Sequence, residues 1–199
     1  MVVCKCHDLP IDSMNPMPSG VEVRQSSISN QGLFAVKTFK MNEKIFCFVG
    51  VLATDEETSP YALQVDEDLF LESTCGFDDF LNHSCDPNCY VDFKKLHLMS
   101  KRDINIGEEL TINYNTSEYD LVGGKVDCSF TCKCGAANCL GIVKGFKHMS
   151  PYDQKSLKDF LSPFLLKKSG ISASRPRGIV HECIPEDTRV PRSNTSSTA

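Results

Sequence analysis

Three short segments carry the strongest structural signal in this chain: NHSCDPN at residues 82–88, GEELTINY at residues 107–114 and CKCGAANC at residues 132–139. The first is rich in Asn, Asp, Ser and Pro, which favour tight turns. The second begins as a turn around a glycine and continues into a strand-like run that ends at Tyr114. The third places three thiols within eight residues. The segments therefore predict a turn, a strand and a cysteine-rich loop, in that order.

Outward from these segments, most of the apolar pattern has a period of two. Apolar and polar residues alternate over residues 21–24, 44–49, 90–93 and 96–99, with polar breaks between these runs. This period is typical of half-buried strands. The sequence therefore predicts a mostly β domain.

A helical pattern follows late in the chain. Ser150 and Pro151 are typical of a helix N-terminus. Apolar residues then recur at helical spacing up to Leu165, although Pro163 should kink or divide the segment. We expect a helix that packs against the β domain, with a helix that docks onto a partner as the alternative.

The cysteines indicate metal before disulfide. The N-terminus lacks the long apolar region of a signal peptide, so we expect an intracellular chain with reduced thiols, in the nucleus or the cytoplasm. Structural zinc takes four tetrahedral ligands, and Cys132, Cys134 and Cys139 supply three. Either Cys128 or Cys85 is suited to be the fourth, and spacing alone does not choose between them; free thiols in a loop are the alternative. For Cys4 and Cys6, we favour cysteines without a metal-binding role over two ligands of a second metal site.

Charge is distributed unevenly along the 199 residues. The net charge of −5 combines −10 over residues 1–139 with +5 over residues 140–199, and residues 55–79 hold nine acids and no Lys or Arg. We therefore expect no tight direct binding to nucleic acid, and a basic partner or substrate instead. The acidic run is alternatively an ordinary solvated face. No stretch approaches the ~20 apolar residues that a membrane helix needs, so no membrane partner is expected.

Together with GLFA at residues 32–35, the three segments closely resemble SET-domain protein-lysine methyltransferases that carry a post-SET zinc motif. The resemblance covers roughly residues 20–147. It implies small curved sheets in a β-clip-like arrangement with a knot-like core, a post-SET zinc loop and a C-terminal helix. The domain organisation that follows is an N-terminal segment (1–19), a SET domain (20–120), a post-SET zinc motif (121–147), a C-terminal helical extension (148–168) and a flexible tail (169–199).

The resemblance also implies a function and a set of site residues. The function is transfer of methyl groups from S-adenosylmethionine to a lysine side chain of a basic protein or peptide, such as a histone tail. The alternative is a catalytically weak SET-like module that serves as a protein-interaction domain. The implied residues are Tyr114 and Tyr61 for catalysis, Gly32, Leu33, Phe34, Asn82, His83 and Phe130 for the cofactor, and Cys85, Cys132, Cys134 and Cys139 for one structural zinc ion.

Overall fold

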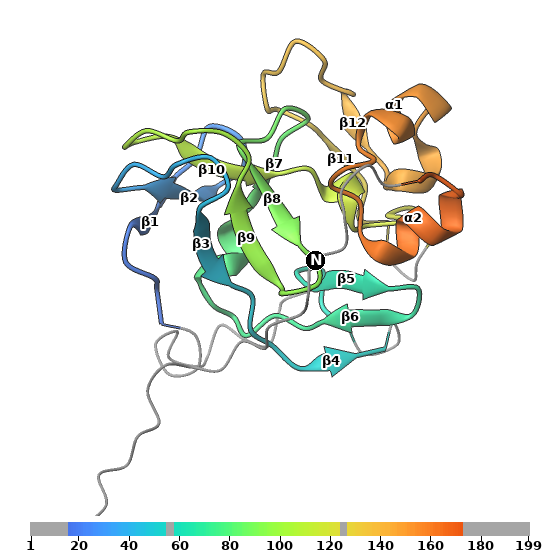
Figure 1. Ribbon diagram of the computed structural model, residues 1–199, viewed down its shortest axis with the longest axis horizontal. Helices are drawn as coiled ribbons and strands as arrows, with labels where there is room; N and C mark the ends of the chain where they lie inside the picture. Colours follow the sequence, from blue (N-terminus) through green and yellow to red (C-terminus); the bar gives the residue numbers. More distant parts are fainter. Residues whose placement is uncertain (1–15, 55–57, 124–126, 173–199) are drawn as a thin grey trace, which may run out of the picture.

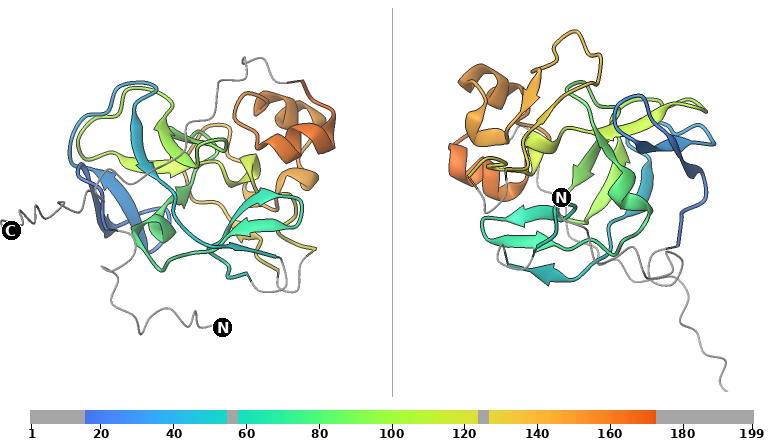
Figure 2. Two further views of the ribbon diagram at one scale, coloured as in Figure 1. Left: turned by 60° about the horizontal axis from the view of Figure 1, so that its bottom comes forward. Right: turned by 180° about the vertical axis from the view of Figure 1, so that it is seen from behind.

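A computed structural model of the chain describes residues 16–54, 58–123 and 127–172. These residues form four small sheets, with the C-terminal helices (orange) gathered at one side (Figure 1). The turned views in Figure 2 show the helices at the same side of the sheets. The predicted mostly β architecture is confirmed.

The strands pair within four separate sheets. The four-stranded sheet has the order β1 (Val21–Gln25), β2 (Gln31–Ala35), β10 (Glu109–Ile112), β7 (Asn82–His83). Two three-stranded sheets have the orders β3 (Lys44–Cys47), β9 (His97–Ser100), β8 (Cys89–Asp92) and β4 (Leu52–Ala53), β6 (Leu69–Leu71), β5 (Leu63–Asp66). The last sheet pairs β11 (Phe130–Thr131) with β12 (Ile142–Val143). The four predicted strand runs each coincide with one of β1, β3, β8 and β9.

The parallel pairing of β7 with β10 positions the candidate site. Thr111 lies opposite Asn82 and Ile112 lies opposite His83, whereas the other strand pairs of the described chain are antiparallel. The pairing brings residues 82–88 and 107–114 side by side. This is the region where the resemblance implies the knot-like core.

The strand predicted for residues 111–114 ends early. β10 stops at Ile112, and the side chain of Asn113 accepts a hydrogen bond from the backbone N–H of Asn115. This cap starts a 3₁₀ turn, η3 (Tyr114–Thr116), because a short Asn side chain competes well for nearby backbone donors. Tyr114 is therefore the first residue of a turn and not a strand residue.

The C-terminal helical pattern forms two helices, α1 (Pro151–Ser156) and α2 (Pro163–Ser169). Ser150 caps α1 by accepting the backbone N–H of Asp153. Pro163 is in the first turn of α2, where its missing N–H costs nothing, so the predicted division at this proline is confirmed. Two further 3₁₀ turns complete the described helices: η2 (Phe77–Phe80) and η4 (Phe146–His148).

Apolar packing divides the molecule into a main core and a smaller one. The main core joins the four-stranded sheet to the β3-β9-β8 sheet around Leu33, Leu98 and Leu110. The smaller core lies under the helices and includes Phe146 and Leu165. The C-terminal extension therefore packs mainly within its own apolar cluster, and Phe160 also contacts Tyr90 of β8, with 5.2 Å between ring centroids.

Several sequence expectations fall outside the described residues. These expectations concern residues 1–15, which include Cys4 and Cys6, and residues 173–199 of the predicted tail. The domain boundaries stay predictions. Among the described residues, no helix is long and apolar enough to cross a membrane.

Candidate active site and metal centre

Tyr114 is held at three points where the paired segments meet. Its backbone N–H donates to Nδ1 of His83 at 3.0 Å, and its hydroxyl donates to the carbonyl oxygen of Leu81 at 2.8 Å. Its ring packs edge-on against the imidazole of His83, with 5.3 Å between ring centroids. The side chain therefore has a single defined orientation beside the 82–88 turn.

Phe130 joins these two rings from a different part of the chain. Its ring centroid lies 5.7 Å from that of His83 and 5.8 Å from that of Tyr114, both edge-on. We call His83, Tyr114 and Phe130 the ring cluster. It combines side chains from β7, η3 and β11, so the segment that precedes the cysteine triplet is packed directly on the candidate site.

Burial keeps the polar groups of the ring cluster neutral. Burial raises the pKa of Tyr114, and the nearby carboxylates of Glu118 and Glu109 act in the same direction. Burial also lowers the pKa of His83 to about 4. At neutral pH the phenol keeps its proton, and the imidazole is uncharged.

Four thiols gather next to the ring cluster. The Sγ atoms of Cys85, Cys132, Cys134 and Cys139 all lie within 4.8 Å of one another, and we call these residues the cysteine cluster. Cys85 comes from the 82–88 turn and the other three from the segment after β11. Cys128, which is also described, is not a member of this group.

The geometry of the cysteine cluster fits zinc. Tetrahedral coordination with Zn–S bonds of about 2.3 Å puts ligand sulfurs about 3.8 Å apart. The Sγ atoms of Cys85 and Cys132 are 3.9 Å apart. Backbone N–H groups of Leu140 and Gly141 point at Sγ of Cys85 and Cys139, an arrangement that stabilises thiolates. The cluster could hold one zinc ion.

The thiol pKa values also favour a cation at this place. Although burial acts in the opposite direction, hydrogen bonds from the backbone N–H groups of Cys85 and Ala136 lower the pKa of Cys134 to about 6. Burial raises the pKa of Cys85, and the adjacent thiols of Cys132 and Cys134 raise it further by charge repulsion. A divalent cation would relieve that repulsion, because it binds the thiolate form of each ligand.

A second polar network holds the loop that precedes β2. The side-chain N–H₂ of Asn82 donates to the carbonyl of Gln31 at 2.9 Å and to Oε1 of Glu109 at 2.7 Å. Oγ of Ser26 donates to the same carboxylate and lies 2.8 and 2.9 Å from its two oxygens. The side chain of Asn82 is therefore used to fix residues 26–31.

Gly32 is required by this network. A Cβ at Gly32 would lie 2.2 Å from Oε1 of Glu109 and 3.0 Å from Nδ2 of Asn82. Any side chain at this position would therefore displace the Glu109 carboxylate from its contacts with Asn82 and Ser26. Glu109 and Ser26 were not singled out from the sequence; Glu109 lies inside the 107–114 segment, but Ser26 has no local signal.

The remaining predicted site residues differ in burial and in their contacts. The side chain of Leu33 is fully buried in the main core, and Phe34 lies under the guanidinium of Arg24, 4.4 Å from it. Tyr61 lies on the turn before β5 and is 52% exposed. Both tyrosines are described, and no ring contact joins Tyr61 to Tyr114.

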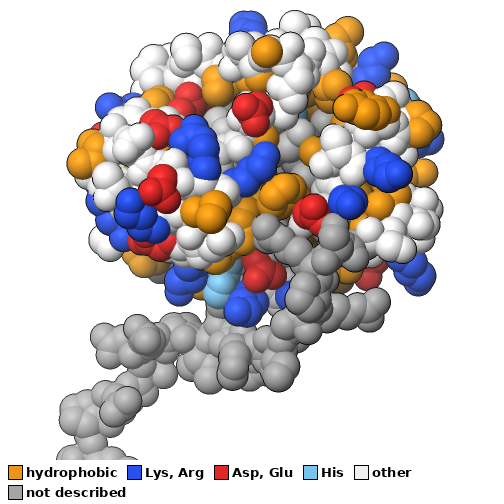
Figure 3. Space-filling view, turned by 45° about the horizontal axis from the view of Figure 1, so that its top comes forward, with side chains coloured by type: hydrophobic (Ala, Val, Ile, Leu, Met, Phe, Trp, Pro, Cys, Tyr) orange, Lys and Arg blue, Asp and Glu red, His pale blue; other side chains and the backbone are white. Residues whose placement is uncertain are grey.

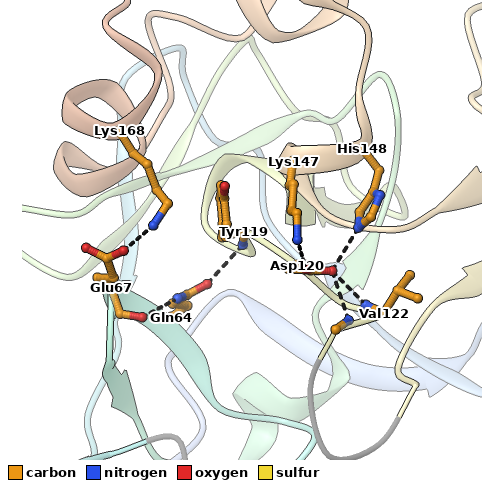
Figure 4. A network of polar contacts seen from close by, with 9 residues as sticks. Gln64, Glu67, Tyr119, Asp120, Val122, Lys147, His148 and Lys168 are labelled. Carbon is orange, nitrogen blue, oxygen red and sulfur yellow. Dashed lines mark hydrogen bonds and ion pairs between the residues drawn. The ribbon is translucent and has the colours of Figure 1, made fainter.

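A third network joins the C-terminal extension to the β5–β6 hairpin (Figure 4). We call it the polar clamp, and its members are Gln64, Glu67, Glu118, Tyr119, Asp120, Lys147, His148 and Lys168.

Gln64 makes the central contacts of the polar clamp. Its backbone N–H donates to Oε1 of Glu118 at 3.2 Å, and its side-chain oxygen accepts the N–H of Tyr119 at 2.9 Å. Lys168 pairs with Glu67 and stands over the ring of Tyr119, 4.4 Å from its centroid. These contacts fasten the hairpin to the turn that carries Tyr114.

The fold and the site are similar to those of a SET domain of the protein-lysine methyltransferase type, and the cysteine cluster fits a post-SET zinc site. Residues 30–115 match the SET domain family. Histone-lysine N-methyltransferase SETD1B of Xenopus laevis is 35% identical over 140 residues, which cover 60% of this chain and 7% of that protein. Histone-lysine N-methyltransferase SETD1 of Drosophila melanogaster is 33% identical over 140 residues, 60% of this chain and 8% of that protein. This chain therefore corresponds to a small part of these relatives.

A solved structure shares the fold. The crystal structure of KRYPTONITE in complex with mCHG DNA and SAH matches with a TM-score of 0.52 and 23% identity, over 61% of this chain and 28% of that chain. At this level of identity the match supports the architecture described above.

Proposed function

We propose that this chain transfers methyl groups from S-adenosylmethionine to lysine side chains of a basic protein substrate. The observation that carries the proposal is the position of Tyr114. It ends the matched SET region, and its protonated hydroxyl is fixed on the Leu81 carbonyl between the 82–88 turn and Phe130. The histone-lysine methyltransferase relatives support the same reaction.

Methyl transfer to an amine is an in-line displacement that depends on alignment and on exclusion of water. When bound, S-adenosylmethionine supplies a methyl group on a sulfonium. In our proposal the Tyr114 hydroxyl orients the lysine amine toward that methyl group, and an apolar surrounding favours the neutral amine. The protein needs no covalent intermediate for this step.

For the donor, we propose a site between loop 26–31, the 82–88 turn and Phe130. Asn82 acts by fixing the loop, since its side-chain donors are used within the protein. Gly32, Leu33 and Phe34 would contribute backbone groups, because the Leu33 side chain is committed to the core. Tyr61 is proposed for the lysine channel; its exposure leaves it free to contact a substrate.

We propose a basic peptide, such as a histone tail, as the substrate, with the nucleus as the place of action. The relatives are named histone-lysine methyltransferases. The hairpin turn between β5 and β6 carries Asp66, Glu67 and Asp68, all exposed. The carboxylate of Glu67 already pairs with Lys168, so Asp66 and Asp68 are the better candidates to attract a cationic peptide. Figure 3 shows Lys and Arg mixed with Asp and Glu over the face that it presents, so that face has no single sign of charge.

The test is transfer of labelled methyl groups from S-adenosylmethionine to core histones by the wild-type chain and by Tyr114→Phe. The variant removes the hydroxyl and keeps the ring, so we expect a loss of at least about 100-fold in rate. Tyr90→Phe is the matched control, because the Tyr90 hydroxyl makes an exposed contact with Asn42, 3.4 Å away. Equal rates for wild type and Tyr114→Phe would contradict the proposal.

Donor binding is measured separately as thermal stabilisation by S-adenosylhomocysteine, since a ligand that binds the native state raises its apparent stability. Stabilisation without histone labelling would indicate a different protein substrate. The absence of both would favour the alternative of a SET-like interaction module, which the retained geometry around Tyr114 disfavours.

A further inference from the structure

The imidazole of His83 lies between the cysteine cluster and Tyr114. On one side its Nδ1 accepts the backbone N–H of Tyr114 at 3.0 Å. On the other side its Nε2 is 3.4 Å from Sγ of Cys85. The residue is 2% exposed, so water does not replace either contact. Both ring nitrogens are therefore used within the protein.

The first contact decides the direction of the second. A nitrogen that accepts an N–H carries no proton, so in the neutral imidazole the proton is on Nε2. That N–H points to Sγ of Cys85. A thiolate ligand of a metal is a charged acceptor, and charge-assisted hydrogen bonds are stronger than neutral ones. This is the arrangement by which groups outside the ligand set orient metal ligands in other proteins.

We propose that His83 is a positioning residue that couples the metal site to Tyr114. One ring orients the Cys85 ligand through Nε2–H and, through Nδ1, holds the peptide N–H that begins the turn carrying the Tyr114 side chain. The inference rests on the proposed function in one respect only: Tyr114 matters for activity if it is the catalytic tyrosine. The coupling itself is a statement about metal retention and about the order of the Tyr114 backbone. It assigns to the His83 side chain a role different from donor binding or proton transfer.

The ring cluster makes this coupling stiff. The His83 ring is packed edge-on by Tyr114 and by Phe130, and Phe130 is two residues before the ligand Cys132. A shift of Cys85 on loss of metal would therefore move the imidazole against both rings. The strand pairing is a second link between these segments, because the backbone N–H of Ser84 donates to the Ile112 carbonyl at 2.9 Å. Substitution of the His83 side chain leaves that backbone link in place and so isolates the contribution of the imidazole.

The test compares zinc retention and amide exchange in wild type, His83→Phe and His83→Gln, with His97→Gln on β9 as the matched control. Phe keeps a ring in the cluster and removes both polar contacts. Gln keeps an N–H₂ group near the position of Nε2. It is the milder substitution, so the test remains possible if His83→Phe fails to fold. We expect zinc transfer to a chromogenic chelator to be about 10-fold faster in His83→Phe, with a smaller change in His83→Gln and none in His97→Gln.

Hydrogen exchange of the Tyr114 amide completes the test. In wild type, chelation should speed this exchange, whereas in His83→Phe the exchange should already be fast and respond little to zinc. Three results would overturn the inference. The first is unchanged zinc release in both His83 variants, and the second is the same response of amide exchange to zinc in wild type and His83→Phe. The third is the absence of zinc from the purified wild-type chain. None of these measurements uses methyl transfer. If the chain shows the coupling but transfers no methyl groups, the proposed function is wrong and the inference about His83 stands.

Discussion

Two regions attach residues 130–169 to the part of this chain that matches the SET domain family, and they do so by different kinds of interaction. The cysteine cluster joins residues 132–139 to the 82–88 turn through four thiols within 4.8 Å. The polar clamp joins residues 147–168 to the β5–β6 hairpin mainly through ion pairs and hydrogen bonds, several of them exposed. A closed metal site concentrates its free energy in one place, whereas exposed ion pairs are weakened by water and salt.

The two regions also differ in their distance from the proposed chemistry. The cysteine cluster touches His83, which touches Tyr114. The polar clamp approaches Tyr114 only through Glu118, whose backbone N–H donates to the Tyr114 carbonyl at 2.8 Å. We therefore expect damage to the first region to abolish activity and damage to most of the second to alter stability modestly.

The largest effect is expected from the cysteine cluster. Cys139→Ser, or chelation of the wild type, should disorder residues 130–143 and remove activity, since such a site contributes on the order of 10 kcal/mol to local folding. Limited proteolysis and thermal melting measure the change. Cys128→Ser is the matched control, because it removes a thiol outside the cluster. Similar behaviour of the two variants would show that the four thiols do not act as a metal site.

The next effect concerns the buried part of the polar clamp. Burial raises the pKa of Glu118 to about 7, against hydrogen bonds from Gln64 and Ser117 that favour the charged form. An unfolded glutamate has a pKa of about 4.3, so between these values the folded state holds the extra proton. Stability from this group is therefore complete below about pH 4 and is lost as pH rises through 7.

Glu118→Gln should remove that pH dependence. Relative to the variant, wild type should lose up to about 2 kcal/mol of unfolding free energy between pH 5 and pH 8. Denaturant melts at several pH values measure the difference, with Glu22→Gln on β1 as the control. A difference that stays constant with pH would mean that Glu118 has the same pKa in the folded and the unfolded chain, so that burial does not shift its protonation.

A smaller effect is expected at Asp120. Its carboxylate accepts from Lys147 and His148 and from the backbone N–H groups of Val122 and Gly123. The hydrogen bond from Lys147, with the others, holds the pKa of Asp120 well below its usual range. Asp120→Asn should cost about 1 kcal/mol after allowance for screening, measured at pH 7 by denaturant melting. The cost should shrink as pH falls through the carboxyl range, and a cost that grows in acid would contradict the ion-pair explanation.

The smallest effect is expected at the surface of the clamp. Lys168→Met removes the pairing with the exposed Glu67 and should change Tm by less than about 2 °C. The difference from wild type should vanish in 1 M salt. If Lys168→Met instead lowered activity as much as Cys139→Ser, the contrast between the two regions would be wrong.

Parts of the site could be predicted because their signals are local. The spacing of Cys132, Cys134 and Cys139 predicts a metal-binding loop. By residue type, Ser150 predicts a helix start and Pro163 predicts a break. The fourth ligand was different: spacing left Cys85 and Cys128 open, and only the resemblance favoured Cys85, which the structure places in the cluster.

Other parts had no local signal. The hydrogen bond between Ser26 and Glu109 joins residues 83 positions apart in the sequence, and the hydrogen bond between Gln64 and Glu118 joins residues 54 positions apart. Neither residue pair belongs to a spacing pattern, because the contacts arise from strand pairing and from packing of the C-terminal extension. The sequence likewise predicted a place for His83 near a donor site but not the direction of its ring.

By itself, then, the sequence determined the β-rich class, the order of the three segments, the metal-binding chemistry of the thiols and the break at Pro163, since each depends on neighbours along the chain. The tertiary structure decided which cysteine completes the cluster and that His83 faces a thiol and a peptide N–H at once, whereas the turn at Tyr114 is set locally by Asn113. The position of His83 beside Tyr114 follows from the parallel pairing of β7 with β10. Parallel strands cannot be joined by a tight turn, so their pairing is set by packing of distant segments and not by the residues between them.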